Sequence, residues 1–386
     1  MSKLLDDVQY LAGTIGPRGT GTPAEAAAAD YVAKRLVDLG LAPEKHVFRS
    51  VPSQNAFPIA ISLIAVLGAM IYPLGGFVTH GLAAVLSLAA AWLLWQTIRN
   101  APFNPLLALL PKVTSQNIEA RLQPKNKPSR KVVLLAHLDT NRCRLVWQSL
   151  TVRSLEPMTW LTLSIPVCMG GLYLAGTLSL GSTWIWWASL PLVAYELGAI
   201  ITLLRDDRTP YSPGAHDNAA SVAVAMELAA RLSTAALQNT EVWFLFDGAE
   251  ETDHAGVIDF LRRHGDALQE ASFIGMEGLG SGELVYLTRE GICAPYHPTP
   301  ELLAVAESVA GKHPEYEFHP AQMLAEDDVR TLRVRGYHAI GIAGRDLQTG
   351  ILPHWHRPDD TPETVSEETM QQAVKIVLAL LMEIDR

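Results

Sequence analysis

Hydrophobic and polar positions alternate along most of the chain, but two long apolar segments interrupt the pattern. Residues 50–98 and residues 157–195 contain no Asp, Glu, Lys or Arg. Each segment holds two apolar runs, and each run is close to the ~20 residues that a helix needs to cross a bilayer. The four runs are residues 57–76, 77–96, 158–176 and 183–204. We therefore expect each segment to fold as a hairpin of two transmembrane helices.

Aromatic and basic residues lie where membrane hairpins would place them. Tryptophans cluster near the ends of the runs, as they do at membrane interfaces: Trp92, Trp95, Trp160, Trp184, Trp186 and Trp187. Basic residues flank the outer ends of the hairpins: Lys45, Arg49, Arg99, Lys112, Arg142, Arg144, Arg153, Arg205 and Arg208. The short links at residues 73–76 and 178–182 carry none. Because Lys and Arg stay on the cytoplasmic side of a membrane, we expect the chain outside the hairpins to lie in the cytoplasm. The expected partner of the hairpins is a lipid bilayer, that of a bacterial inner membrane.

Two soluble arrangements are the alternatives to this interpretation. The apolar runs would also suit helices buried inside a large domain, or an exposed apolar surface that pairs two copies of the chain. Glu196 stands inside the last run, where a carboxyl group is costly in a membrane. It therefore either faces another helix or lies at the cytoplasmic interface. The oligomeric state stays open, a homo-oligomer included.

Outside the apolar segments, helical and strand patterns alternate. Helical periodicity covers residues 22–40, 220–234, 254–268 and 363–384. Short apolar runs typical of strands cover residues 43–51, 115–122, 131–139, 241–247, 272–280 and 337–343. This alternation predicts an α/β fold, a three-layer sandwich with a mixed, largely parallel sheet. The domain would comprise residues 1–49, 100–145 and 206–386, with hairpins inserted at residues 50–99 and 146–205.

Composition supports a membrane-bound protein and argues against a nucleic-acid partner. Hydrophobic residues make up 49% of the 386 residues and charged residues only 18%, which is apolar for an ordinary soluble enzyme. The formal net charge is -10. Because contacts with phosphates need a basic face, we expect no nucleic-acid ligand.

Histidines and acids stand at the ends of the predicted strands and in the turns beside them. They are His137, Asp139, Asp217, Asn218, Glu250, Glu251, Glu277, His354, His356 and Asp360. In open α/β sheets the chemistry collects at the carboxyl ends of the strands. Any one of these residues alone would more simply be a polar strand end or a turn residue. Their number and order nevertheless lead us to expect that they converge.

A mixed set of imidazoles and carboxylates is the ligand chemistry of zinc in hydrolases. A site with two zinc ions needs one bridging carboxylate and about two further ligands for each ion. Asp217 could bridge the two ions. His137 and Glu251 could complete one ion, and Glu277 and His356 could complete the other.

Two further residues then have catalytic roles beside these ligands. Glu250, directly before Glu251, is left over as the general base for the attacking water. We expect burial among cations to keep Glu250 ionised until it acts. Asp139 stands two residues after His137, where its carboxylate could accept the other imidazole N–H.

The order of these motifs resembles that of the di-zinc exopeptidases of metallopeptidase family 28, which includes bacterial leucyl aminopeptidase and aminopeptidase Y. The family order is H-x-D, G-A-x-D-N, E-E, an acidic strand end and H-x-x-x-D-T. Here it reads HLD at 137–139, GAHDN at 214–218, EE at 250–251, MEG at 276–278 and HRPDDT at 356–361. The last motif selects His356 rather than His354 as a ligand.

The resemblance covers residues 1–49, 100–145 and 206–386. It implies a zinc exopeptidase fold, two zinc ions per chain, and a peptide substrate that loses its N-terminal residue. Glu277 departs from the family pattern, which usually has Asp there. The usual Ser-Gly after the D-N pair is also replaced, by Ala219 and Ala220.

Two other functions stay open. A single-zinc acyltransferase of the glutaminyl cyclase type shares the scaffold that the resemblance implies, and the number of bound metal ions would separate it from an exopeptidase. A non-catalytic membrane scaffold is the third candidate. Such a scaffold tends to lose metal ligands, whereas this chain keeps a competent residue at each position.

We predict that the expressed protein sediments with membranes and stays in the pellet through a high-salt wash. Apolar hairpins in the bilayer do not depend on ionic contacts, so salt leaves them in place. The measurement is the fraction of full-length chain pelleted by ultracentrifugation, with detergent as the positive control for release. Release by salt alone would contradict the hairpin assignment.

Overall fold

The computed structural model describes residues 3–144, 146, 151, 154–179, 183–324 and 326–386, so the predicted link at 178–182 lies partly outside the described residues. The chain forms two compact units. The sheet unit comprises Met1–Pro52, Lys112–Ser149 and Pro210–Arg386, and the helical unit comprises Ser53–Pro111 and Leu150–Thr209. The helical unit includes residues 100–111, which the sequence pattern assigned to the soluble domain.

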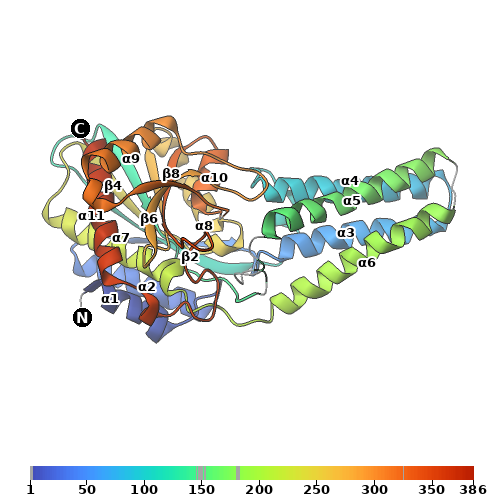
Figure 1. The fold of residues 1–386 in the computed structure, drawn as a ribbon, viewed down its shortest axis with the longest axis horizontal. Helices are drawn as coiled ribbons and strands as arrows, with labels where there is room; N and C mark the ends of the chain where they lie inside the picture. Colours follow the sequence, from blue (N-terminus) through green and yellow to red (C-terminus); the bar gives the residue numbers. More distant parts are fainter. Residues whose placement is uncertain (1–2, 145, 147–150, 152–153, 180–182, 325) are drawn as a thin grey trace. The chain divides into compact units, whose positions relative to one another are not determined.

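One eight-stranded sheet forms the centre of the sheet unit (Figure 1). Its strands are β1 (Glu44–Ser50), β2 (Val113–Leu122), β3 (Arg130–Leu135), β4 (Thr240–Phe246), β5 (Ser272–Glu277), β6 (Glu283–Arg289), β7 (His319–Gln322) and β8 (His338–Arg345). Their order across the sheet is β1-β2-β4-β3-β5-β8-β6-β7. The central strands β4, β3, β5 and β8 pair in parallel, whereas β1, β2 and β6 form antiparallel pairs. The sheet is therefore mixed with a parallel centre.

Alternate residues along the strands pack against helices on the two faces of this sheet. On one face, Val132, Leu134 and Ile340 belong to a large core that five helices help to form. These helices are α1 (Lys3–Val8), α2 (Pro23–Asp38), α7 (Ser221–Thr234), α9 (Pro300–Lys312) and α11 (Glu367–Ile384). On the other face, Val133 and Leu135 pack with α8 (Ala255–His264) and α10 (Asp328–Val334). Helices thus cover both faces of the sheet.

The segment between residues 283 and 322 holds three elements that the sequence analysis did not predict. Strand β6 contains four consecutive apolar residues, Leu284–Leu287, and that signal could have been recognised. Strand β7 contains Pro320 and forms the edge of the sheet, where a short strand leaves little pattern. Helix α9 begins with Pro300.

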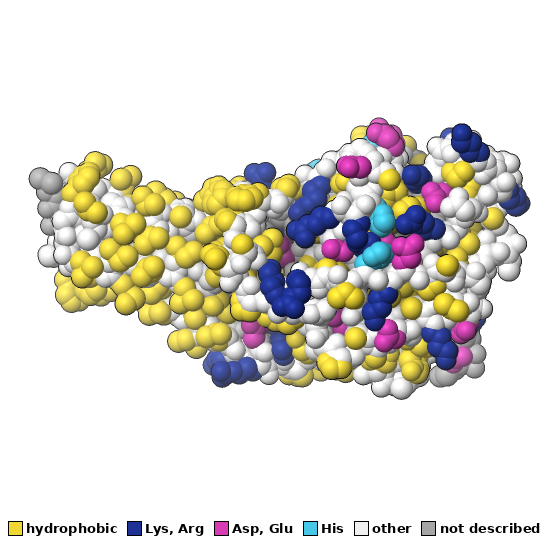
Figure 2. Space-filling view, turned by 180° about the vertical axis from the view of Figure 1, so that it is seen from behind, with side chains coloured by type: hydrophobic (Ala, Val, Ile, Leu, Met, Phe, Trp, Pro, Cys, Tyr) yellow, Lys and Arg dark blue, Asp and Glu magenta, His cyan; other side chains and the backbone are white. Residues whose placement is uncertain are grey.

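The helical unit contains four helices: α3 (Ala56–Ile71), α4 (Phe77–Ile98), α5 (Leu155–Leu178) and α6 (Thr183–Asp206). Helix α4 packs against α3 and α5, and α6 packs against the same two helices, so the four form a bundle. All four are long and apolar enough to cross a membrane, judged by length and composition. Figure 2 shows hydrophobic side chains covering the visible surface of this unit, and exposed residues include Leu67, Met70 and Val78.

Polar side chains inside the helical unit contact one another across helices. Tyr72 stacks on Tyr173 with 4.8 Å between ring centroids, and the Tyr173 hydroxyl donates to Ser189 Oγ at 2.9 Å. Glu196 is only 2% exposed and forms a hydrogen bond with Ser62 of α3. Glu196 therefore faces another helix, which is one of the two positions expected for it.

We predict that Phe260→Ala destabilises the sheet unit by about 3–5 kcal/mol. Phe260 is fully buried on α8 and lies edge-on to Trp243 of β4, with 5.9 Å between ring centroids. The substitution would leave a cavity in the smaller core. Val37→Ala is the control, because Val37 is 58% exposed on α2 and such changes cost about 0.5 kcal/mol or less. Thermal unfolding of the detergent-solubilised chain measures both, and equal midpoints would contradict this packing.

Candidate metal centre

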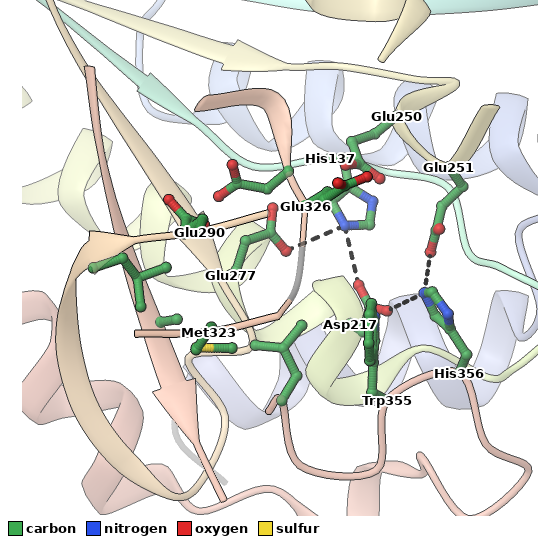
Figure 3. Close-up of a pocket in the computed structure, with 14 residues that line it drawn as sticks. His137, Asp217, Glu250, Glu251, Glu277, Glu290, Met323, Glu326, Trp355 and His356 are labelled. Atoms are coloured by element: carbon green, nitrogen blue, oxygen red, sulfur yellow. Dashed lines mark hydrogen bonds and ion pairs between the residues drawn. The ribbon is translucent and has the colours of Figure 1, made fainter. Parts of the chain in front are cut away.

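Neighbouring parallel strands deliver a histidine and several acids to one edge of the sheet. The strand ends supply His137 after β3, Glu250 and Glu251 after β4, and Glu277 as the last residue of β5. The turn before α7 adds Asp217, and the loop before α11 adds His356. Figure 3 shows these side chains pointing toward one another in a single pocket. The structure thus brings together all five metal-ligand candidates and Glu250.

Asp217 lies between the two histidines and contacts both. His137 Nε2 is 3.1 Å from Asp217 Oδ1 and 3.4 Å from Glu277 Oε2. His356 Nε2 is 3.0 Å from Asp217 Oδ2 and 3.0 Å from Glu251 Oε1. The ligand atoms in each trio lie within 4.8 Å of one another, close enough to hold a metal ion. The two trios share Asp217, so its carboxylate is placed to bridge two ions.

The grouping of the other ligands corrects the sequence analysis. That analysis assigned His137 with Glu251 and His356 with Glu277, whereas the shortest contacts pair His137 with Glu277 and His356 with Glu251. The positions of the two glutamates relative to their strand ends explain the difference. Strands β3 and β5 are neighbours, so His137 and Glu277 leave the sheet side by side. Glu251 instead lies beyond the end of β4 in a short 3-10 turn, Glu250–Thr252.

The charge of the pocket fits bound cations. Among the described residues, seven acids and two histidines line it, together with apolar residues but no Lys or Arg. Burial raises the pKa of Glu277 to about 8. Burial would also raise the pKa of Asp217, yet hydrogen bonds with His137 and His356 hold that pKa below its ordinary value. Divalent metal would offset the concentrated negative charge, and the imidazole and carboxylate ligands suit zinc.

The surroundings of Glu250 differ from the expectation. The sequence analysis expected cations around it, but burial and nearby acids raise the pKa of Glu250 well above its ordinary value, with His137 opposing them. Its Oε1 lies 3.1 Å from Nδ1 of buried His254, which in turn lies 3.4 Å from Asp328 Oδ1. Burial lowers the pKa of His254 to about 4, so that imidazole is neutral near pH 7. His137 favours the ionised form of Glu250, and metal ions bound at the neighbouring ligands would favour it further.

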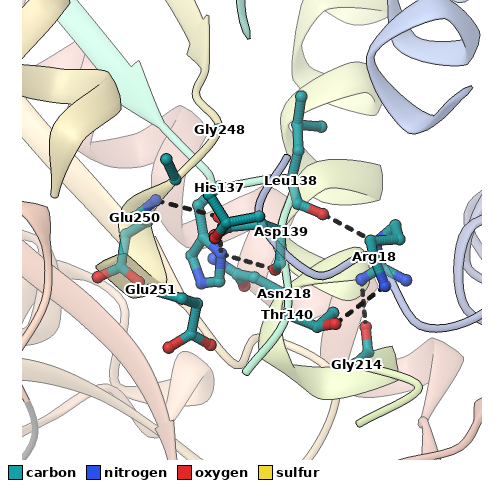
Figure 4. Close-up of polar contacts among 12 residues, drawn as sticks. Arg18, His137, Leu138, Asp139, Thr140, Gly214, Asn218, Gly248, Glu250 and Glu251 are labelled. Atoms are coloured by element: carbon teal, nitrogen blue, oxygen red, sulfur yellow. Dashed lines mark hydrogen bonds and ion pairs between the residues drawn. The ribbon is translucent and has the colours of Figure 1, made fainter. Parts of the chain in front are cut away.

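Asp139 connects two loops of the site. Nδ1 of His137 lies 3.1 Å from the backbone carbonyl oxygen of Asp139 and 3.6 Å from its carboxylate, so the nearer acceptor is the main chain. The carboxylate accepts a hydrogen bond from the backbone N–H of Glu250 at 3.1 Å (Figure 4). It accepts a second one from the Thr20 hydroxyl at 2.6 Å. Asp139 therefore also holds Glu250 in place, a role that the sequence pattern did not suggest.

Two buried residues hold the turn that carries Asp217. Asp360 accepts hydrogen bonds from the backbone N–H groups of His216 and Asp217, at 2.7 and 3.3 Å. The Asn218 amide donates to the carbonyl before Glu277 and accepts from the N–H after it, at 2.8 and 3.2 Å. These contacts tie the bridging carboxylate to both neighbouring loops.

Arg18 and Asn141 support the site, and the sequence analysis missed both. The Arg18 guanidinium is 1% exposed and donates hydrogen bonds of 2.8–3.2 Å to five backbone carbonyls, those of Leu11, Gly16, Leu138, Pro213 and Gly214. Two of these carbonyls flank the ligand loops, as Figure 4 shows. Asn141 donates to Glu251 Oε2 at 2.7 Å. In sequence, both residues are ordinary polar residues of loops.

His354 lies outside the ligand cluster. Its Nδ1 contacts Asp359 at 2.9 Å, and its ring stacks on His216 with 5.3 Å between centroids. His354 is absent from the residues that line the pocket, whereas His356, two positions later, lines it. The structure thus separates the two histidines as the motif does.

We predict that His356→Ala removes one metal ion per chain and leaves the other, because Asp217 and Glu251 alone hold an ion weakly. His354→Ala is the matched control and should keep the full metal content. The measurement is metal per chain by mass spectrometry of the purified protein after buffer exchange. Loss of metal in His354→Ala with retention in His356→Ala would show that the wrong histidine was chosen.

Comparisons with known proteins agree with this geometry. Residues 206–381 match Peptidase family M28. Human endoplasmic reticulum metallopeptidase 1 is 31% identical over 196 residues, which cover 47% of this chain and 20% of the relative. The mouse protein of the same name matches over the same shares. The chain therefore spans about a fifth of the length of these curated relatives.

Solved structures share the fold. Porphyromonas gingivalis glutaminyl cyclase superposes with a TM-score of 0.59 at 14% identity, covering 99% of this chain and 97% of that one. A zinc aminopeptidase from Bacillus subtilis gives 0.57 at 16% identity, covering 99% and 94%. At such identities the likeness concerns the fold. Beyond this shared fold, the comparisons show a match to Peptidase family M28 over residues 206–381, which are less than half of the chain.

Proposed function

We propose that the protein is a membrane-anchored, zinc-dependent aminopeptidase with two metal ions per chain. The observation that carries the proposal is the shared position of Asp217. One of its carboxylate oxygens contacts His137 and the other contacts His356, and each histidine has its own glutamate. Two complete ligand trios around one carboxylate suit two ions better than one.

The chemistry supplied by zinc bound there would be a more acidic water molecule and a polarised peptide carbonyl. His137 and Glu277 would hold one ion, His356 and Glu251 the other, and Asp217 both. Asp139 and Asn218 fix the loops on which these ligands stand.

Glu250 is the acid of the pair that neither trio needs, and it lines the same pocket. It would take a proton from the attacking water and return it to the amine that leaves. The backbone N–H of Glu250 is fixed by Asp139, and its Oε1 lies against His254, so the carboxyl group is held beside the ligands.

A second candidate activity is cyclisation of an N-terminal glutamine by a single zinc ion. The trio of Asp217, Glu251 and His356 would be sufficient to hold one ion, and glutaminyl cyclases share the fold. Metal content separates the two activities, because a cyclase needs one ion per chain and releases ammonia rather than an amino acid.

We propose further that the helical unit anchors the enzyme in a lipid bilayer with the sheet unit on the cytoplasmic side. Four long apolar helices with exposed hydrophobic side chains support the anchor. Basic residues at the outer ends of the two helix pairs support the orientation. A peptide would then reach the metal centre from the cytoplasm.

We predict that Glu250→Gln lowers kcat by about 100-fold or more while both metal ions stay bound. The amide keeps the size of the side chain but cannot accept the proton. Fluorogenic aminoacyl substrates give the rate, and mass spectrometry of the same sample gives the metal content. Glu270→Gln is the control, because Glu270 is exposed and outside the pocket. Turnover retained in Glu250→Gln would remove Glu250 as the general base.

A further inference from the structure

The pocket extends beyond the metal ligands into a second region with its own residues. This region is lined by Leu287, Glu290, Met323, Glu326, Asp327, Ala343, Leu352 and Trp355. Figure 3 shows Glu290 and Met323 on the side of Glu277 that faces away from Asp217 and His356. A substrate side chain beside the scissile bond would enter this region.

Two buried carboxylates meet at the sheet side of this region. A Cβ atom at Gly341 of β8 would lie 3.1 Å from Glu290 Oε2 and 3.4 Å from Asp327 Oδ2. A Cβ at Gly275 of β5 would lie 3.5 Å from the same Asp327 oxygen. The two glycines, on adjacent strands, thus leave the space that the two carboxylates share.

These carboxylates are incompletely paired within the described part of the chain. Glu290 is 2% exposed and Asp327 is 4% exposed. Tyr296 contacts both of them, and its hydroxyl donates to Asp327 Oδ1 at 3.1 Å. Glu290 Oε1 and Asp327 Oδ2 nevertheless accept no hydrogen bond from any described residue. Burying two such carboxylates together is costly unless a cation joins them.

Glu326, the third acid of the region, is already neutralised. It forms an ion pair with Arg330, and its other oxygen accepts a hydrogen bond from the backbone N–H of Ile292 at 3.2 Å. Within the described residues, the oxygens of the two remaining acids without a donor are Glu290 Oε1 and Asp327 Oδ2, whereas Asp327 Oδ1 also accepts the Val329 backbone N–H at 2.9 Å as the cap of α10.

The rest of the region is apolar. Leu287, Met323, Ala343, Leu352 and Trp355 line it. An apolar wall that leads to buried carboxylates matches a side chain with a hydrocarbon stem and a cationic end. A leucine side chain would fill the apolar part but leave both carboxylates buried without a counter-charge, which costs binding energy.

We propose that Glu290 and Asp327 select substrates whose N-terminal residue is lysine or arginine. This inference rests on the proposed aminopeptidase function and names its substrate class. The methylene stem would lie against the apolar residues, and the ammonium or guanidinium group would bind between the two carboxylates, close to Gly341.

The test compares lysine with norleucine, which keeps the lysine stem but lacks the cationic group. Zinc-loaded, full-length protein in detergent is assayed with lysyl, arginyl and norleucyl fluorogenic substrates. We expect kcat/KM for the better basic substrate to exceed that for norleucine by about 30-fold or more, the value of a buried charge pair. Equal values for the three substrates would overturn the proposal.

Variants separate side-chain recognition from other roles of the acids. Glu290→Gln and Asp327→Asn should lower kcat/KM for the basic substrates and leave norleucine nearly unchanged. Glu307→Gln, an exposed residue of α9 outside the pocket, should change neither. If the two pocket variants lose activity equally on both substrate classes, the acids bind the common α-amine or support the fold, and the proposal fails.

A binding measurement keeps this inference distinct from the proposed function. Calorimetry compares free lysine with free norleucine on the same zinc-loaded protein, and it needs no turnover because neither has a bond to cleave. Preferential binding of lysine that Glu290→Gln abolishes would support the pocket even if no peptide were hydrolysed. Equal binding of the two amino acids would overturn it even if norleucyl substrates were hydrolysed.

Discussion

The site depends on one electrostatic constraint: several carboxylates are buried together, and no Lys or Arg is among the described residues that line the pocket. Buried carboxylates that face one another raise each other's pKa and destabilise the fold unless positive charge is added. The two histidines offset part of this negative charge, because each contacts one oxygen of Asp217 and one glutamate. The remaining charge is what divalent ions would neutralise. Metal binding and folding of the loops around Asp217 are therefore expected to be linked.

The ends of parallel strands form one wall of the site and bring these carboxylates together. Strands β4, β3 and β5 are adjacent, so their following residues reach the same edge of the sheet. Buried polar residues then fix the loops: Asp139 joins His137 to Glu250, and Arg18 binds backbone carbonyls on both ligand loops. Because these groups bond mainly to backbone atoms, they hold positions without competing for the metal ligands.

The same pocket combines the candidate metal centre with a second region that suits substrate recognition in our proposal. Glu277 belongs to the first and Glu290 to the second, and both stand at strand ends near β8. Glycines at positions 275 and 341 provide room for Asp327 and Glu290 on the sheet surface. The helical unit has a separate role, because its long apolar helices and exposed hydrophobic side chains suit a lipid environment rather than water.

The sequence by itself determined the local features. Period-two and period-3.6 patterns located most strands and helices, long charge-free runs located the four apolar helices, and strand-end motifs named the five ligand candidates and Glu250. Tertiary structure alone decided which ligand meets which. Strands β4 and β5 both flank β3, but Glu277 ends β5 beside His137, whereas the turn after β4 carries Glu251 to His356. No local pattern encodes these positions. The roles of Arg18, Asn141 and Asp327 also emerge only in three dimensions, because each depends on partners more than 30 residues away or on a strand packed beneath it.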